Sequence, residues 1–152
     1  MDRLTYRSAT RADLPFIINL AAADDVSGTI DPWRAEAAEG YAAVLAQIDA
    51  DPNDEFFVVE HEHAAIGMFQ LTYLTSITRP GMRRGLVESV HVIHEARNRG
   101  FGSEMMRWAI ARCRACGCGI VQLTSNKRRT DAHRFYKALG FTASHEGFRL
   151  FL

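Results

Sequence analysis

The chain has 152 residues, of which 47% are hydrophobic and 24% charged, as expected for one globular domain spanning residues 1–152. Its 18 basic residues balance its 18 acidic ones, so no net charge favours nucleic acid or an anionic membrane as a partner. The chain has no apolar run long enough for a bilayer, no signal-peptide pattern, and three clustered cysteines without a distant partner, so we expect a cytoplasmic protein.

The first half of the chain predicts a strand, two helices and a β-hairpin. Thr10 and Asp13 resemble a capping box at the start of the first helix. Asp31 followed by Pro32 predicts the start of the second helix. In chain order these elements are a strand at 4–7, helices at 10–23 and 31–50, and hairpin strands at 55–60 and 64–74.

The second half alternates strands and helices. In chain order we expect a basic loop at 78–85, a strand at 86–93, a helix at 103–116, a strand at 120–124, a helix at 130–139, and short final strands at 141–143 and 148–152. Neither a repeat nor a linker interrupts this order. The sequence therefore predicts a mixed α/β domain.

The loop between the strand at 86–93 and the helix from Ser103 is the most informative stretch. It reads Arg97-Asn98-Arg99-Gly100-Phe101-Gly102. Glycines allow positive φ, and the free N–H groups at a helix N-terminus favour anions. Arginines can bind phosphate oxygens with two hydrogen bonds. The loop therefore predicts a site for a phosphorylated ligand, most simply a diphosphate, with a plain strand-to-helix turn as the alternative.

A second motif predicts an amphipathic helix that a glycine ends. It reads Ala132-His133-Arg134-Phe135-Tyr136-Lys137-Ala138-Leu139-Gly140-Phe141. Together with the loop, this motif resembles the GNAT family of acetyl-CoA-dependent N-acetyltransferases. That family has Gln/Arg-x-x-Gly-x-Gly/Ala between a strand and a helix, and a later helix with Ala, Tyr and Gly-Phe at these offsets. The resemblance covers nearly the whole chain, because the expected element order is also the family's.

The resemblance implies a single domain with a central, mostly antiparallel, splayed sheet flanked by helices. It implies acetyl-CoA as cosubstrate and no metal. The diphosphate of coenzyme A would bind the N–H groups of the loop, and its pantetheine arm would pair with an open strand edge. The implied cofactor-binding residues are Val90, His91, Val92, Arg97, Asn98, Arg99, Gly100, Phe101, Gly102 and Ser103.

One position departs from the family pattern. Many members have Asn three residues before the helix alanine, where this chain has Arg129. Asn126 could take over the amide contact to pantetheine, or Arg129 could contact the adenosine phosphate. Both assignments stay open.

The resemblance also implies direct attack of a primary amine, from a small molecule or a peptide, on the acetyl group. Tyr136 matches the family tyrosine that hydrogen-bonds or protonates the sulfur of coenzyme A. Glu88 is the candidate base, because it lies in an apolar strand two residues before Val90 and so on the same face. The alternative for Glu88 is a solvated carboxylate or one paired with Arg83 or Arg84. A non-catalytic coenzyme A sensor or interaction module is the rival function.

The remaining polar residues leave alternatives open. Arg79, Arg83 and Arg84 could bind an acidic part of the acceptor or could be solvated in their loop. The three cysteines fit buried structural residues better than half a zinc site, since a fourth ligand is missing. We expect the histidines at 61 and 63 to be solvated in the hairpin turn. The late apolar residues permit a homodimer; these are Phe148, Leu150 and Leu152.

Overall fold

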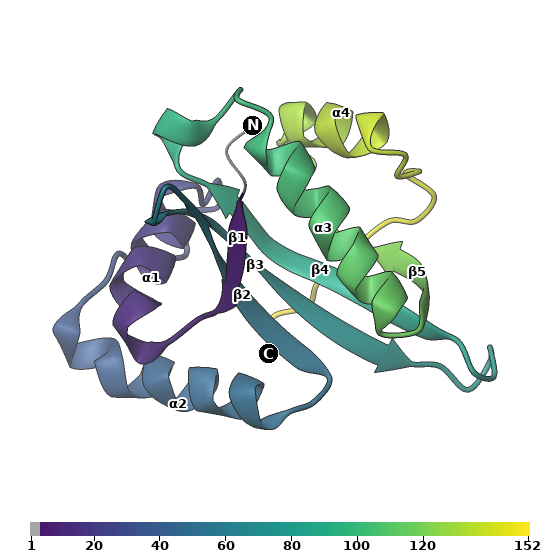
Figure 1. Ribbon diagram of the computed structural model, residues 1–152, viewed down its shortest axis with the longest axis horizontal. Coiled ribbons are helices and arrows are strands. Elements are labelled where there is room, and N and C mark those ends of the chain that lie inside the picture. Colours follow the sequence, from purple (N-terminus) through teal and green to yellow (C-terminus); the bar gives the residue numbers. More distant parts are fainter. Residues whose placement is uncertain (1–3) are drawn as a thin grey trace. The chain divides into compact units, whose positions relative to one another are not determined.

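The computed structural model describes residues 4–152, which form two compact units that divide after Gln122. The first unit holds one sheet with strands β1 (Thr5–Ser8), β2 (Asp54–His61), β3 (Ala64–Thr75), β4 (Arg83–Val92) and β5 (Cys118–Gln122), in that spatial order (Figure 1). Its helices are α1 (Leu14–Ala23), α2 (Ala38–Ala50) and α3 (Phe101–Ala115). The second unit, Leu123–Leu152, contains α4 (Thr130–Ala138). The predicted mixed α/β fold is confirmed, whereas the single domain over 1–152 stays a prediction.

The sheet is antiparallel except at its β5 side, and it splays there as expected. β4 and β5 run parallel and pair only from Arg83 opposite Cys118 to Leu86 opposite Gln122. Beyond Leu86, β4 continues to Val92 and pairs only with β3 within the described sheet. β4 also begins at Arg83, three residues earlier than predicted, because these residues pair with Thr75 and Leu74 of β3.

The predicted hairpin between β2 and β3 is confirmed. Glu62 and His63 form its two-residue turn, with φ of 50° and 66°, as tight hairpin turns require. His61 ends β2 and is only 8% exposed, with its ring 4.7 Å from that of Phe101. The expectation of a solvated His61 is therefore wrong, because α3 begins directly over this end of the hairpin.

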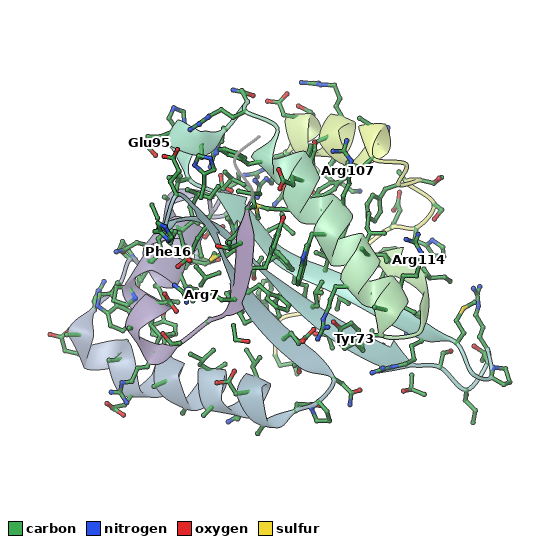
Figure 2. The ribbon with its side chains drawn as sticks, viewed as in Figure 1. Arg7, Phe16, Tyr73, Glu95, Arg107 and Arg114 are labelled. Atoms are coloured by element: carbon green, nitrogen blue, oxygen red, sulfur yellow. The ribbon has the colours of Figure 1, made fainter. Side chains whose placement is uncertain are left out.

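Helices cover both faces of the sheet. On one face, α1 and α2 form a buried cluster that includes Leu14, Ile17, Leu20, Leu45, Val58 and Met68. On the other face, Trp108 of α3 stacks on Tyr6 at 4.2 Å and meets the rings of Phe57 and Phe69. Further along α3, Arg112 donates to Glu55, which also accepts a hydrogen bond from the hydroxyl of Tyr73. Tyr73 is labelled among the side chains in Figure 2. The apolar stripes of the helices thus bury both sides of β2 and β3.

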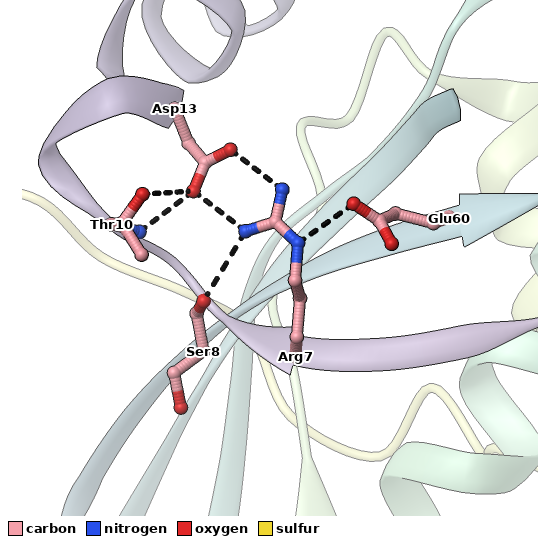
Figure 3. A network of polar contacts seen from close by, with 5 residues as sticks. All are labelled: Arg7, Ser8, Thr10, Asp13 and Glu60. Carbon is pink, nitrogen blue, oxygen red and sulfur yellow. Dashed lines mark hydrogen bonds and ion pairs between the residues drawn. The ribbon is translucent and has the colours of Figure 1, made fainter. Parts of the chain in front are cut away.

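A polar network connects β1, the turn before α1, and β2 (Figure 3). Asp13 accepts from the backbone N–H of Thr10 at 2.7 Å, so the predicted capping interaction at the start of the first helix is present. The same carboxylate accepts two hydrogen bonds from Arg7 at 2.7 and 2.8 Å, and Arg7 also binds Glu60. One guanidinium therefore fixes the helix entry against the sheet.

The second helix begins later than predicted. A 3₁₀ turn at Ala35–Ala37 precedes α2, and Arg34 before it has an extended backbone. The N–H of Trp33 donates to Asn19 Oδ1 at 2.9 Å, and its ring lies 5.9 Å from that of Tyr41. These contacts with α1 and α2 keep Trp33 outside the helix, so the Asp-Pro start signal is overridden.

The predicted final strands at 141–143 and 148–152 are wrong, because no strand is found from residue 141 to residue 152. A strand needs a neighbour for its N–H and C=O groups, and the backbone bonds of this segment are short turns, such as Ser144 N–H to Thr142 C=O. Phe148 and Leu152 are 90% and 115% exposed. The apolar alternation that suggested strands therefore lacks a pairing partner here, and the homodimer stays a prediction.

Candidate functional site

The Gly-rich loop is shorter than predicted, because α3 begins at Phe101, two residues before the expected start at Ser103, and so includes Gly102. Asn98 and Gly100 have φ of 60° and 84°, and a Cβ on Gly100 would meet open space. Gly100 caps α3, whose first helical bond runs from Glu104 N–H to Gly100 C=O at 3.1 Å. The N–H groups of 101–103 therefore precede the hydrogen-bonded part of the helix, and the cap residue Gly100 offers them no side-chain bond within residues 4–152. This arrangement suits an anionic ligand.

The strand before the loop contains a β-bulge. Met68 pairs with His91 and Gln70 pairs with Glu88, so one residue of β3 faces two of β4. Ser89, within the bulge, has φ of 52°. The argument that Glu88 shares a face with Val90 is therefore wrong, because alternation breaks at the bulge. Pairing across β3 places Glu88 on the same face as His91 instead.

The open edge of β4 lies where the resemblance requires it. β5 ends its pairing at Leu86, so the side of β4 away from β3 lacks a strand partner from Val87 to Val92 in the described sheet. An extended chain with amide groups could pair with such an edge. The predicted pantetheine contacts at 90–92 fall within this segment.

Two predicted cofactor residues meet at an acidic side chain that sequence reasoning missed. Asp24, at the end of α1, lies 2.7 Å from His91 Nδ1 and accepts from Arg97 Nη2 at 3.1 Å. Arg97 Nε also donates to the C=O of Val92 at 3.0 Å. Nothing in the local sequence marks Asp24, since only tertiary packing brings α1 to β4. The Arg97 side chain thus connects the open edge, the loop and α1.

Arg99 is exposed, and its guanidinium is 4.8 Å from the ring centroid of Phe101. Phe101, the first residue of α3, is buried and packs against the ring of His61, and this contact fixes the end of the loop. Arg99 therefore remains available at the surface near the start of α3, and its contact with a phosphate stays a prediction.

Two predicted site residues lie in the second unit, 123–152. Tyr136 belongs to α4, with its ring 5.1 Å from Phe135 and 5.9 Å from Phe141. Asn126 organises the turn before this helix, because its side chain accepts from Arg128 N–H at 2.9 Å and its C=O accepts from Arg129 N–H. Their roles toward the cosubstrate stay predictions.

Residues 4–152 contain no group of three His, Cys, Asp or Glu side chains that could hold a metal ion. Cys113, a residue of α3, is fully buried, and burial raises the pKa of its thiol to about 12. Cys116 and Cys118 are half-buried. A helix both long and apolar enough to cross a membrane is likewise not found in this part of the chain.

Comparison with known proteins agrees with this geometry. The model of the acetyltransferase (GNAT) family matches residues 20–141, which include β4, the loop and α4. The chain belongs to the GNAT family. The GNAT family uses acetyl-CoA, and an N-acetyltransferase of this family implies an amine acceptor.

Individual relatives extend this result. An aminoalkylphosphonate N-acetyltransferase from Salmonella typhimurium is 29% identical over 107 residues, covering 70% of this chain and 66% of that protein. The chain thus matches just under two thirds of that relative's length. A transcriptional regulator from Bacillus halodurans C-125 is 36% identical with a TM-score of 0.90, over 99% of this chain and 100% of that one.

A more distant structure shares the fold alone. Glucosamine-6-phosphate N-acetyltransferase from Arabidopsis thaliana superposes with a TM-score of 0.79 at 17% identity, over 99% of both chains. Such a likeness supports the GNAT architecture and says nothing of substrate.

Proposed function

We propose that this GNAT protein transfers the acetyl group of acetyl-CoA to a primary amine. The observation that carries the proposal is the continuity of two features: the edge of β4 from Val87 to Val92 that has no strand partner among residues 4–152, and the N–H groups of the first turn of α3. The amide groups of a pantetheine arm can pair with the backbone of the β4 edge. The diphosphate of the same molecule can accept hydrogen bonds from the N–H groups of α3, which follow that edge after a short loop. The residues present fit both parts of coenzyme A.

Different groups of the chain bind different parts of coenzyme A. N–H groups of 101–103 hold phosphate oxygens, and Gly100 lets the backbone approach because a Cβ is absent. Arg97 fixes the C=O of Val92 and thereby the end of the open edge. Asn126 and Arg129 supply further polar groups ahead of α4, for pantetheine or for the adenosine phosphate.

In the transfer, the amine nitrogen bonds to the acetyl carbon and the bond from that carbon to sulfur breaks. Glu88 takes the proton that the amine must lose, directly or through a water molecule. Tyr136 gives a proton to the departing sulfur, so the products are the N-acetylated amine and the free thiol. Exposed Glu88 lies beside the point where β4 and β5 part, which supports this role.

Small-molecule amines are the favoured acceptors over peptides. The Salmonella relative, by its name, acts on aminoalkylphosphonates, which are small primary amines. That relative matches 70% of this chain, including the loop region. A panel of small primary amines should therefore be tested first as acceptors.

The test combines binding and turnover. Calorimetry should show that acetyl-CoA and coenzyme A bind and ATP does not, and a thiol-release assay should detect acetylation in the panel. Tyr136→Phe should keep the acetyl-CoA Kd and lower kcat by about 100-fold. Glu88→Gln should slow turnover most at low pH, where the neutral amine is scarcest. Failure to bind acetyl-CoA would overturn the proposal, and unaffected turnover in either variant would remove that residue's role.

A second function has one observation in its favour. The Bacillus halodurans protein, 36% identical over nearly all of this chain, is described as a transcriptional regulator. A coenzyme A-binding sensor or interaction module with the same fold would explain that description. Tight binding of acetyl-CoA without thiol release for any amine would favour this alternative.

A further inference from the structure

Arg84 occupies an unusual place for an arginine, in the interior of the sheet. It pairs with Leu74 of β3 on one side and with Ile120 of β5 on the other. A residue flanked by two strands has a fixed backbone, so its side chain leaves the sheet from a defined point. The solvated-loop alternative for this arginine is therefore wrong, since β4 has already begun.

The two neighbouring arginines differ in how their guanidinium groups are satisfied. Arg83 donates to Cys116 C=O at 3.0 Å and to Asn53 Oδ1 at 2.6 Å, and lies over the ring of Tyr73. Arg84 donates one bond, from Nη1 to Gln122 Oε1 at 3.1 Å. Its Nε is buried and meets no acceptor within residues 4–152. Within residues 4–152 the guanidinium therefore keeps hydrogen-bonding capacity beyond its bond to Gln122, and this capacity is available to a ligand that reaches the Nη groups.

Arg84 faces the same side of the sheet as Glu88. Residues 84, 86 and 88 alternate before the bulge and pair with 74, 72 and 70 of β3, whereas Gly85 faces Cys113 of α3 on the other side. Arg84 and Glu88 are four positions apart along the strand, which corresponds to about 13 Å between their Cα atoms. The two side chains can lean toward each other over Leu86, and so can reach opposite ends of one small molecule.

The partner Gln122 marks the point where the sheet opens. It pairs with Leu86 as the last residue of β5, and its side-chain oxygen orients the guanidinium. Arg84 is thus a cation held beside the start of the open β4 edge. A planar guanidinium oriented in this way matches a phosphonate, phosphate or carboxylate.

We propose that Arg84, oriented by Gln122, binds an anionic group of the acceptor, so that the acceptor is a small primary amine carrying a phosphonate, phosphate or carboxylate. The inference rests on the proposed acetyltransferase function, because Glu88 is assigned the amine end. It adds a specificity-determining residue and a substrate class. Amines without an anionic group, such as propylamine and ethylenediamine, give the guanidinium no anion to bind and are the poorer acceptors.

The test measures binding first and turnover second. Calorimetry with the coenzyme A complex compares 2-aminoethylphosphonate, β-alanine, propylamine and ethylenediamine. We expect the two anionic amines to bind at least about 10-fold more tightly than the other two. Arg84→Met should raise the Kd of the anionic amines by about 100-fold and change the Kd of propylamine by less than about 3-fold. Arg84→Lys, which keeps the charge, should recover part of the loss.

Controls separate this inference from the proposed function. Arg79→Met removes an exposed loop arginine and should leave the Kd of both classes of amine unchanged. An unchanged Kd for coenzyme A shows that Arg84→Met is folded. Anionic binding that depends on Arg84 supports the inference even where no amine is acetylated, in which case only the proposed function fails. Absence of any anionic preference, or an equal loss for every amine in Arg84→Met, overturns the inference. Tighter binding of 2-aminoethylphosphonate but not of β-alanine would support the inference for phosphonate-bearing acceptors and exclude carboxylate-bearing ones.

Discussion

At the scale of single residues, Asp13 shows how one carboxylate stabilises a junction of elements. It accepts hydrogen bonds from the Thr10 N–H and from Arg7, which in turn binds Glu60 (Figure 3). The hydrogen bonds from Arg7 are the main cause that lowers the pKa of Asp13 from its ordinary value of 3.8 to about 2. A depressed carboxyl pKa means that the folded state favours the charged form.

This shift predicts a pH-dependent loss in Asp13→Asn. The stability from a depressed carboxyl is present above its unfolded pKa and is lost as the pH falls through the folded pKa. Asp13→Asn should lower the free energy of unfolding by about 1–2 kcal/mol at pH 7, and the difference should shrink between about pH 4 and pH 2. Urea unfolding at several pH values measures it. Asp31→Asn, which removes an exposed pair with Arg34, is the control and should cost less than about 0.5 kcal/mol. A loss of equal size at pH 2 would contradict a charge effect at Asp13.

Sequence reasoning identified several residues of the candidate site without placing them. The Gly-rich loop was predictable because positive φ and helix capping are local properties of Asn98 and Gly100. Glu88 was found as the polar residue of an apolar strand, yet its face was predicted wrongly because the bulge at Ser89 depends on pairing with β3. Asp24 gave no local signal.

At the scale of elements, the packing of α3 on β4 depends on a missing side chain. A Cβ on Gly85 would lie 2.5 Å from Cys113 Sγ, closer than any real contact, and Cys113 is fully buried. Glycine therefore lets the helix approach the strand. The helix could not keep this distance over a larger residue.

Gly85→Ala should accordingly destabilise the protein by about 1–3 kcal/mol, because Cys113 or α3 must shift. Cys113→Ala in the same chain should recover part of that loss, so the double variant should be more stable than the sum of the single effects predicts. Gly40→Ala is the matched control. Gly40 lies in α2 with nothing within 4 Å of an added Cβ, and this change should stabilise by up to about 1 kcal/mol. Chemical unfolding of the four variants decides, and strict additivity at 85 and 113 would argue against a steric contact.

Elements with strong local signals were predicted well. The capping pair at Thr10 and Asp13 and the two-residue hairpin turn both act within a few residues. The start of α2 was missed because Trp33 donates to Asn19 of α1, a contact between segments. The final strands were predicted from apolar alternation alone, which describes a strand's faces and does not supply its neighbour.

At the scale of the whole molecule, ligand binding should be visible as stability. A ligand that binds only the folded state stabilises it by about 2.7 kcal/mol at a concentration of 100 Kd. For a chain of this length that corresponds to a rise in Tm of about 5–10 °C. Thermal unfolding with acetyl-CoA should show this rise, and ATP at the same concentration should not. Equal shifts with both ligands would point to a general nucleotide site.

The sequence by itself determined the Gly-rich loop, the hairpin, the helix that follows the Thr10–Asp13 cap and the resemblance to the GNAT family. These features follow from backbone preferences and periodicities that each residue carries with its neighbours. Only the tertiary structure decided which edge of β4 stays open, which face Glu88 takes, and that Arg84 lies inside the sheet with a buried, unpaired Nε among the described residues. Strand pairing sets all three, and it joins residues far apart in the chain.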